Sequence, residues 1–520
     1  MTSTARLEEL LNSKALFFLC VLCAALLSYG YEIFSFHLTI DEELHAQLYN
    51  SVPWAAKTWL IQGRWGMAIL NIILLRQTIL PVVSSAIGVA GVAGCLYFFL
   101  SSILESRIAI LAGVIFGLSF PTLPFVFTFS TLAYGIGVGS ICTAVFLNHS
   151  YADNYGKRLS ATCFGAFAIA IYQPFVFVFI IIVLCVIFKK LTDPKNAVSA
   201  WTTLQRMLIS LSASIMLYTL IDRAIRYALN IQIGYVQSFV DLPGLLANPI
   251  TRLGAAIFRV LNVFRISPVL FGTDAALVTT VLLISCGLLF ATSLNGNSLK
   301  NKVLRYASLI ALLATLVVAE AITPSGVPLR SMIYVTFFVA AIIGLAVELA
   351  PSSCKIPLFI LFFFATVDGA AVANRLFLSS DLVYAKDKQL AVELSQQIRS
   401  QTEGGKTNSV KELYIVGKWS WPITNLTPKT ETFGASFFEW EEGNRWRIAS
   451  IMRLNSDLSI GGATTKSVRM AVEQIPSMPT WPNEDSVKVI NGLAIVKFGD
   501  FSSTQRTELC SLDIKRYCDQ

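Results

Sequence analysis

The chain has 520 residues, of which 55% are apolar and only 14% are charged. Soluble domains carry about 25% charged residues, so this composition and the mean hydropathy of +0.64 exclude an ordinary soluble protein and indicate an integral membrane protein. The net charge of +8 does not indicate nucleic-acid binding, because the basic residues are spread over short loops, as the positive-inside rule expects.

About eleven apolar stretches are predicted to cross a bilayer, judged against the roughly 17–25 residues that a spanning helix needs. They cover residues 15–36, 81–104, 108–124, 128–148, 159–171, 173–188, 206–228, 274–294, 304–322, 330–349 and 356–376. The fifth and sixth are short, and Tyr172-Gln173-Pro174 interrupts them. This pattern predicts a helical hairpin whose tip lies inside the protein, because irregular backbone at membrane depth must be covered.

The distribution of basic residues predicts the orientation. With the N-terminus inside, the inner loops are short and dense in Lys and Arg, whereas the outer loops are longer and poorer in them. The first outer loop then covers residues 37–80, and everything after about residue 377 also lies outside. The first span is too long, and lacks the small-residue cleavage site, to be a removed signal peptide. Residues 1–376 are therefore predicted to form a transmembrane region.

After residue 377 the composition becomes that of a soluble domain. Residues 385–403 have helical periodicity, 413–416 form a predicted strand, and 486–498 form a predicted hairpin around Asn491-Gly492. The sequence thus predicts a small α+β domain over residues 377–520. Cys510 and Cys518 are its only cysteines, and in an oxidising outer compartment we expect them to form a disulfide.

Three adjacent carboxylates follow the first span, at Asp41, Glu42 and Glu43, and His45 lies close to them. Carboxylates beside a bilayer are costly to desolvate, which favours chemistry or ion handling. A structural interpretation is equally good for part of the motif. Thr39 and Glu42 have the spacing of a capping box, and acids in a first helical turn interact favourably with the helix dipole.

Arginines in three predicted outer loops, Arg64, Arg265 and Arg330, suit an anionic lipid headgroup, with Arg252 and Arg259 as further candidates. Guanidinium binds phosphate bidentately and remains charged at any relevant pH. The alternative for each arginine is ordinary snorkelling to the membrane interface.

Candidate sugar-binding residues occur in two places. Tyr172 and Gln173, at the hairpin tip, could bind a sugar, or they could satisfy backbone groups that Pro174 leaves free. In the tail, Trp440 lies in a segment that combines aromatic and acidic residues, Phe437 to Glu442, with Trp446 close by. Such a segment suits carbohydrate contact, although packing of the domain explains the aromatic residues equally well.

Three motifs together resemble a known family. Thr39-Ile40-Asp41-Glu42-Glu43 after the first span, then Gln62-Gly63-Arg64-Trp65, then Tyr172-Gln173-Pro174, resemble the phage-encoded glucosyltransferases that change O-antigen serotype in enteric bacteria, the type II glucosyltransferase family. The resemblance covers most of the membrane region. It implies a GT-C-like membrane enzyme in the bacterial inner membrane, with the active site and C-terminus in the periplasm.

The resemblance also implies the reaction and its participants. The donor would be undecaprenyl-phosphate glucose, which a companion synthase makes and a companion flippase delivers, and the acceptor would be a sugar of the lipopolysaccharide O-antigen. Asp41 would be the general base and Glu42 its partner, with Glu43 and His45 in support. A lipid phosphodiester is already a good leaving group, so no metal or other cofactor is expected. No nucleotide-binding or zinc-binding motif stands out.

Two other functions remain open from the sequence. A flippase for lipid-linked sugars would show internal repeats and charges near the bilayer midplane, neither of which is clear here. A non-catalytic membrane partner with a sugar-binding tail is the other. The same architecture also occurs in transferases of mannose and of aminoarabinose, so a different donor and acceptor is a further alternative.

Overall fold

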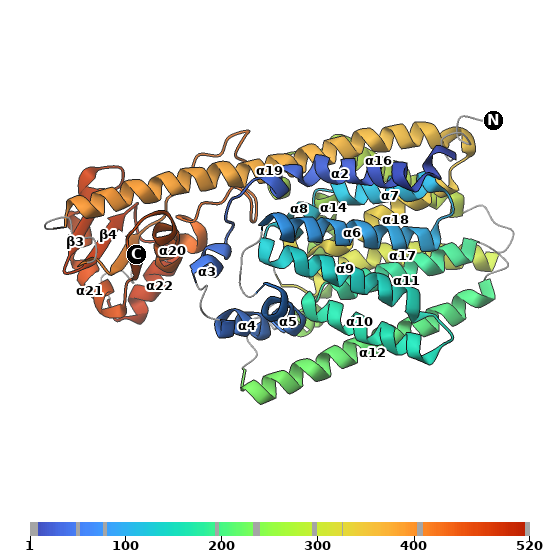
Figure 1. Ribbon diagram of the computed structural model, residues 1–520, viewed down its shortest axis with the longest axis horizontal. Helices are drawn as coiled ribbons and strands as arrows, with labels where there is room; N and C mark the ends of the chain where they lie inside the picture. The colour runs from blue at the N-terminus through green and yellow to red at the C-terminus, as the bar shows by residue number, and fades with distance from the viewer. Residues whose placement is uncertain are drawn as a thin grey trace. The chain divides into compact units, whose positions relative to one another are not determined.

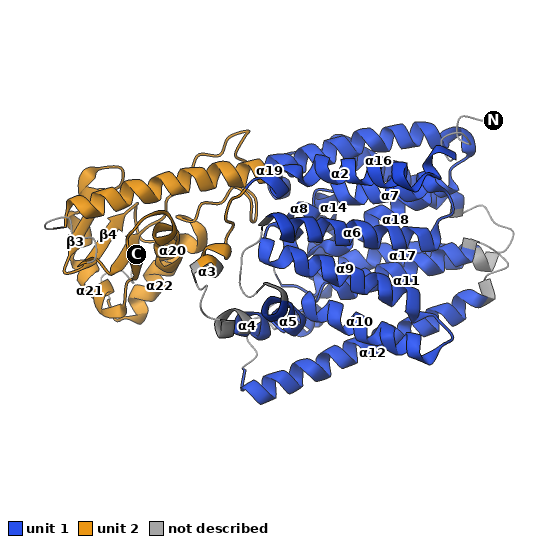
Figure 2. Ribbon diagram, in the orientation of Figure 1, with its two compact units in different colours: residues 1–35, 50–375 blue, residues 36–49, 376–520 orange. Residues whose placement is uncertain are grey.

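The computed structural model describes residues 9–47, 52–75, 81–192, 197–231, 240–293, 299–324, 326–402 and 409–514. The chain forms two compact units (Figure 2). Unit 1 contains Met1–Ser35 and Asn50–Arg375, and unit 2 contains Phe36–Tyr49 and Leu376–Gln520. The segment that carries the three adjacent carboxylates therefore belongs to the same unit as the C-terminal residues.

The described residues of unit 1 are almost entirely helical. Its elements are α2 (Lys14–Phe34), α4 (Val52–Ile61), α5 (Trp65–Leu70), η1 (Asn71–Leu75), α6 (Pro81–Ile103), α7 (Arg107–Ser119), α8 (Leu123–Phe127), α9 (Ser130–Ser150), α10 (Tyr155–Ile171), α11 (Phe175–Thr192), α12 (Ala197–Leu229), α13 (Leu242–Ala247), α14 (Pro249–Phe264), α15 (Pro268–Phe271), α16 (Ala276–Ser293), α17 (Leu299–Ala321), η4 (Leu329–Ser331), α18 (Ile333–Leu349) and the first part of α19 (Ser352–Ser400). Many of the long helices run side by side (Figure 1). Helix α9 packs on α6 and α10, and α18 packs on α7, α11 and α16.

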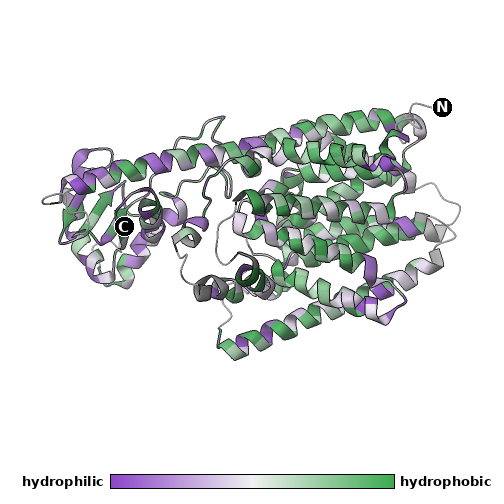
Figure 3. Ribbon diagram, in the orientation of Figure 1, coloured by the Kyte–Doolittle hydropathy of each residue, from purple (hydrophilic) through white to green (hydrophobic). Residues whose placement is uncertain are grey.

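Six helices among the described residues are long and apolar enough to cross a membrane. They are Lys14–Phe34, Val82–Ile103, Ser130–Ser150, Ser199–Leu229, Lys302–Ala321 and Ser352–Ser400. Hydrophobic residues dominate the helices of unit 1 (Figure 3). Other predicted spans are shorter than expected. Helix α7, for example, has 13 residues, about 20 Å at 1.5 Å per residue, against a hydrocarbon core of about 30 Å. The six long apolar helices support the prediction of a membrane protein, whereas the predicted count of eleven spans is not confirmed.

Loops predicted to share one side of the membrane contact one another within unit 1. On the predicted inner side, Glu348 accepts hydrogen bonds from the backbone N–H groups of Glu105 and Ser106, and it pairs with Lys189 at 3.2 Å. On the predicted outer side, the Tyr172 hydroxyl donates to the Arg330 carbonyl at 2.8 Å. The connectivity of the predicted spans is thus consistent with these contacts.

Helix α19 differs from the sequence prediction. We expected a span at 356–376 and a separate helix at 385–403, but Ser352–Ser400 is one helix of 49 residues. The intervening segment has neither glycine nor proline, so nothing in it interrupts the helical hydrogen bonds.

Unit 2 combines a four-stranded sheet with helices. Its elements are α3 (Glu42–Gln47), the rest of α19, β1 (Glu412–Val416), η7 (Trp440–Glu442), α20 (Arg445–Asn455), β2 (Gly461–Gly462), α21 (Thr465–Gln474), η8 (Ile475–Ser477), η9 (Glu484–Ser486), β3 (Val487–Ile490), β4 (Leu493–Lys497) and α22 (Ser503–Ser511). The strand order is β2-β1-β4-β3, with β1 parallel to both of its neighbours and β3 antiparallel to β4.

The sheet confirms two sequence predictions. Strand β1 covers the predicted strand, and β3 and β4 form the predicted hairpin, with Ile490 opposite Leu493. Asn491 and Gly492 have φ values of 48° and 81°, the left-handed conformation that a two-residue hairpin turn requires. Inward-facing Tyr414, Val416 and Ile495 meet Val468 and Leu509 in the core. Cys510 is disulfide-bonded, while its predicted partner Cys518 lies outside the described residues, so this pairing remains a prediction.

Candidate functional site

A buried arginine gathers three carboxylates in unit 2. Arg447 on α20 contacts Glu43 through Nη1 at 2.7 Å, and through Nη2 it contacts Asp41 at 2.7 Å and Glu441 at 2.9 Å. We call these four residues the acid cluster. Helix α3 packs on α20, which brings the beginning of the chain to the C-terminal residues of the same unit.

The three adjacent carboxylates have different environments. The Asp41 side chain is 52% exposed, whereas that of Glu43 is fully buried. Glu42 is also buried, and its Oε2 accepts the backbone N–H of Thr39 at 3.0 Å. This bond is the Glu42 half of the capping box that the sequence predicts. Asp41 is therefore the member of the triplet whose carboxylate a substrate can reach.

Burial and the guanidinium act in opposite directions on the acid cluster. Burial raises the pKa of the Glu43 carboxyl to about 7, although the charge of Arg447 opposes this shift. Hydrogen bonding from Arg447 lowers the pKa of Glu441. Burial disfavours the charge of Arg447, yet its carboxylate partners raise the pKa of Arg447 well above its usual range. Arg447 is thus a permanent cation, and the protonation of Glu43 changes near neutral pH.

The two more exposed carboxylates of the acid cluster, Asp41 and Glu441, both have left-handed backbone. Asp41 has φ of 79° and Glu441 has φ of 49°, conformations that are costly for residues other than glycine and less so for aspartate. Glu441 is also held by the Asn444 side-chain amide, which donates to its Oε2 at 2.6 Å. Strain that the surrounding structure maintains is common at functional sites.

Two residues of the acid cluster, Glu441 and Arg447, are each preceded in the sequence by a tryptophan. Trp440 precedes Glu441 and is partly buried. Trp446 precedes Arg447 on α20, and its side chain is 52% exposed. A Cβ atom at Gly462 would lie 2.5 Å from the Trp446 ring, so the indole lies directly over strand β2. An exposed indole with polar neighbours is suited to stacking against a sugar ring.

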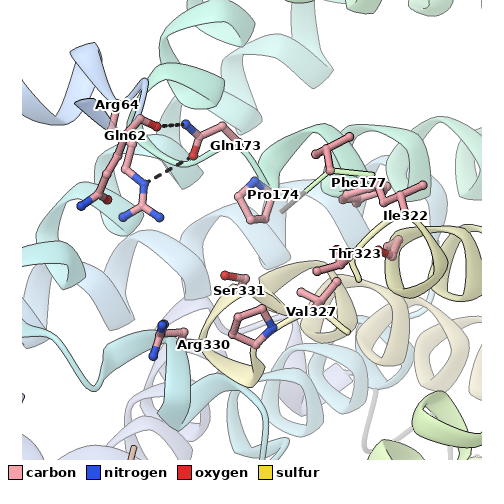
Figure 4. A pocket seen from close by; sticks show the side chains of 13 residues that line it. Gln62, Arg64, Gln173, Pro174, Phe177, Ile322, Thr323, Val327, Arg330 and Ser331 are labelled. Atoms are coloured by element: carbon pink, nitrogen blue, oxygen red, sulfur yellow. Dashed lines mark hydrogen bonds between the residues drawn. The ribbon is translucent and has the colours of Figure 1, made fainter. Parts of the chain in front are cut away.

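Unit 1 contains a separate pocket with two arginines (Figure 4). Arg64 with Gln62 and Gln173 lies on one side, and Arg330 with Ser331 lies on the other. Its lining residues are Gln62, Arg64, Gln173, Pro174, Phe177, Val240, Ala319, Ile322, Thr323, Val327, Pro328, Arg330 and Ser331. We call it the arginine pocket. These described residues include two cations and no carboxylate, which favours an anionic ligand.

The hairpin tip holds the arginine pocket together. The Gln173 side chain donates to the Gln62 carbonyl at 2.8 Å and accepts from Arg64 Nε at 3.4 Å. Tyr172 lies under the Arg64 guanidinium, 4.8 Å from ring centre to Cζ, and its hydroxyl bonds the Arg330 carbonyl and the Ser331 hydroxyl. The break between α10 and α11 therefore connects the segments that carry the two arginines.

An ion pair between a partly exposed arginine and a buried glutamate fixes the loop before Arg330. Glu320 accepts the backbone N–H of Val327 at 2.9 Å, and Arg259 donates to the Val327 carbonyl at 2.8 Å. Arg259 and Glu320 also pair with each other at 3.3 Å. Gly326 has φ of +80°, and a Cβ there would lie 2.8 Å from Arg259. The loop that lines the arginine pocket is thus held on its other side by α14 and α17.

Only some of the site residues predicted from the sequence lie at the arginine pocket. Arg64, Tyr172, Gln173 and Arg330 gather at the arginine pocket, with Tyr172 behind its lining. Arg265 is exposed at the end of α14 and does not line this pocket. The side chain of His45 lies outside the described residues. The roles proposed for all these residues remain predictions.

Sequence reasoning did not find Arg447 or Glu441 as partners of the triplet. They lie about 400 residues away in the sequence, and no motif links the two segments. The only signal was indirect, because a cluster of buried carboxylates requires a nearby cation. The three adjacent carboxylates could thus have indicated a cation nearby, but this prediction was not made.

Comparison with known protein families gives a match over most of the membrane region. The family model described as Glucosyl transferase GtrII matches residues 30–345, more than half of the chain. No curated protein matches the chain. The matched range includes the three adjacent carboxylates and the whole arginine pocket, but it ends before Glu441, Trp446 and Arg447.

Proposed function

Because the chain belongs to the glucosyl transferase GtrII family, a glucosyltransferase family, we propose that it transfers glucose from undecaprenyl-phosphate glucose to a sugar of the lipopolysaccharide O-antigen. The reaction takes place on the periplasmic face of the bacterial inner membrane, and it inverts the anomeric configuration. A companion synthase and a flippase supply the lipid-linked glucose.

The arginine pocket is the observation that carries the choice of donor. Two guanidinium groups, two glutamines and a serine hydroxyl converge without a carboxylate among the described lining residues. Guanidinium binds phosphate oxygens in a planar, bidentate geometry. Most of the other lining residues are apolar, as a phosphate that carries a lipid chain requires. We assign the phosphate of the donor to Arg64 and Arg330.

The acid cluster supplies the general base. The Asp41 carboxylate takes the proton of the acceptor hydroxyl, whose oxygen attacks C1 of the glucosyl group. The bond from C1 to the phosphate oxygen breaks, and undecaprenyl phosphate leaves with the electron pair. A positioned general base contributes about 10²–10⁴-fold to the rate, and stabilisation of the leaving phosphate by arginines contributes a comparable or larger factor.

The residues around Asp41 then position it or contact the acceptor. Glu42 caps the turn through Thr39 and so positions Asp41. Arg447 holds Asp41 by an ion pair of 2.7 Å, which orients its carboxylate. Trp440 and Trp446, beside Glu441 and Arg447, are candidates to contact the acceptor sugar.

A transfer assay with purified protein tests this function. The protein in detergent is given O-antigen acceptor together with labelled undecaprenyl-phosphate glucose or, in a parallel reaction, labelled uridine diphosphate glucose. We expect label in the acceptor only with the lipid donor, and linkage analysis then identifies the position. Transfer from the nucleotide donor alone would contradict the proposed donor. A complete lack of transfer with active controls would favour a flippase.

A further inference from the structure

Unit 2 contains a polar hollow that none of the roles above uses. Glu393, Gln396, Gln397 and Ser400 line it from α19, and Trp481 and Pro482 face them. The four α19 residues have the spacing i, i+3, i+4 and i+7, which places them on one face of the helix. The hollow therefore has a polar side, formed by α19, and an apolar side, formed by Trp481 and Pro482.

The walls of the hollow are held in place by their neighbours. One turn beyond Gln397, the Gln401 side chain donates to the Val487 carbonyl and accepts the Val489 N–H, which fixes α19 against β3. On the other wall, the backbone N–H of Trp481 donates to the Lys497 carbonyl at 2.8 Å, and its ring contacts Phe498. Only 9% of the Trp481 side chain is exposed. A preformed hollow costs a ligand little reorganisation.

The polar groups in the hollow suit a ligand that both donates and accepts hydrogen bonds. Gln397 Oε1 is buried and has no hydrogen-bond partner among the described residues. Each amide offers a carbonyl acceptor and an N–H₂ donor, as sugar hydroxyls also do. No basic side chain lines the hollow, so an anion is disfavoured. The exposed Pro482 ring, with the small exposed part of the Trp481 indole beside it, offers an apolar surface to the C–H face of a sugar.

We propose that this hollow is a second carbohydrate-binding subsite, which holds a neutral segment of the acceptor polysaccharide at a distance along the chain from the sugar that reacts. The proposal rests on the proposed function, because it supposes a polymeric acceptor. A peptide segment, or water alone, is the competing occupant.

The test compares acceptors of different length. Binding of lipid-free O-polysaccharide to the full-length protein in detergent is measured by calorimetry, with one preparation of a single repeat and another of about ten repeats. The Gln396→Ala/Gln397→Ala variant should weaken binding of the long chain by about 10-fold, since two neutral hydrogen bonds are lost, and should leave the single repeat unchanged. Val392→Ala, an exposed position on the same helix outside the hollow, should match wild type with both.

The possible results separate this proposal from the proposed function. Equal binding of the long chain by wild type and by the double variant would overturn the subsite, even if glucose transfer is observed. The same weakening for both chain lengths would also overturn it, because it would place the reacting sugar in the hollow or show damage to the fold. A wild-type protein that binds long chains through the hollow but transfers no glucose would overturn only the proposed function.

Discussion

Arg447 and Asp41 form an ion pair of 2.7 Å although 406 residues separate them in the sequence. The same guanidinium reaches Glu43, so the C-terminal part of the chain supplies the cation that the N-terminal carboxylates require. The residues after 376 are therefore a component of the candidate site. Deleting them would remove both Arg447 and the helix on which α3 packs, so the three adjacent carboxylates would lose the partner that holds them.

Glu43 predicts a pH dependence of stability. Burial raises the pKa of its carboxyl from 4.5 to about 7, in contact with Arg447 and near Asp41. The folded protein then binds this proton more tightly than the unfolded chain does. The stabilisation is fully present below about pH 4.5 and is lost as the pH rises to about 7. Its contribution to the free energy of unfolding is at most about 3 kcal/mol.

Thermal unfolding of the purified protein between pH 5 and pH 8 measures this effect. We expect the unfolding midpoint of wild type to fall with rising pH relative to that of Glu43→Gln, whose amide does not titrate. Parallel curves for the two proteins would assign the pH dependence to other groups.

Arg330→Lys tests the phosphate role of the arginine pocket. An ammonium cannot reproduce the planar pair of donors, so we expect KM for the lipid donor to rise by about 10–100-fold, with KM for the acceptor unchanged. Steady-state kinetics with each substrate limiting makes the distinction. Arg265→Lys is the matched control, because Arg265 does not line the arginine pocket. Equal effects in both variants would indicate a shared role at the membrane interface.

Gly326→Ala tests whether the loop before Arg330 shapes the arginine pocket. Gly326 has φ of +80°, and an added Cβ would lie 2.8 Å from Arg259. Left-handed backbone costs a residue such as alanine about 1–2 kcal/mol, and the contact adds to this. We expect a lower unfolding midpoint and weaker donor binding.

Gly254→Ala on α14 controls for that substitution. A Cβ at Gly254 meets nothing within 4 Å, and alanine favours a helix over glycine by up to about 1 kcal/mol. Its stability and donor KM should equal or exceed those of wild type. If Gly326→Ala behaves in the same way, the loop does not need its left-handed turn.

The orientation in the membrane is tested by reporter fusions. Alkaline phosphatase, which is active only outside the cytoplasm, should be active when fused after residue 380 or residue 520, and inactive after residue 155 or residue 300. The reason is the density of basic residues in the predicted inner loops. The opposite pattern would place the acid cluster in the cytosol, where nucleotide sugars are the available donors.

Sequence reasoning predicted the local features well. The Asn491-Gly492 hairpin and strand β1 depend on neighbouring residues alone, and the break at Tyr172-Gln173-Pro174 depends on one proline. It also identified Arg64, Gln173 and Arg330, which converge at the arginine pocket, without predicting that they meet. It missed Arg447 because an ion pair between segments that are 404 and 406 residues apart leaves no periodic pattern. The sequence predicts two elements where α19 is one helix, because its first half is apolar and its second half is polar, although no glycine or proline interrupts the helix between them.

The single-turnover rate of Asp41→Asn with lipid-linked glucose tests the central claim most directly. Asparagine is nearly isosteric with aspartate and tolerates the left-handed φ of 79° at this position, so the fold and the thermal unfolding midpoint should be preserved while the basicity is lost. We expect the rate of glucose transfer to fall at least about 100-fold. A variant that keeps more than about a tenth of the wild-type rate would show that Asp41 is not the base.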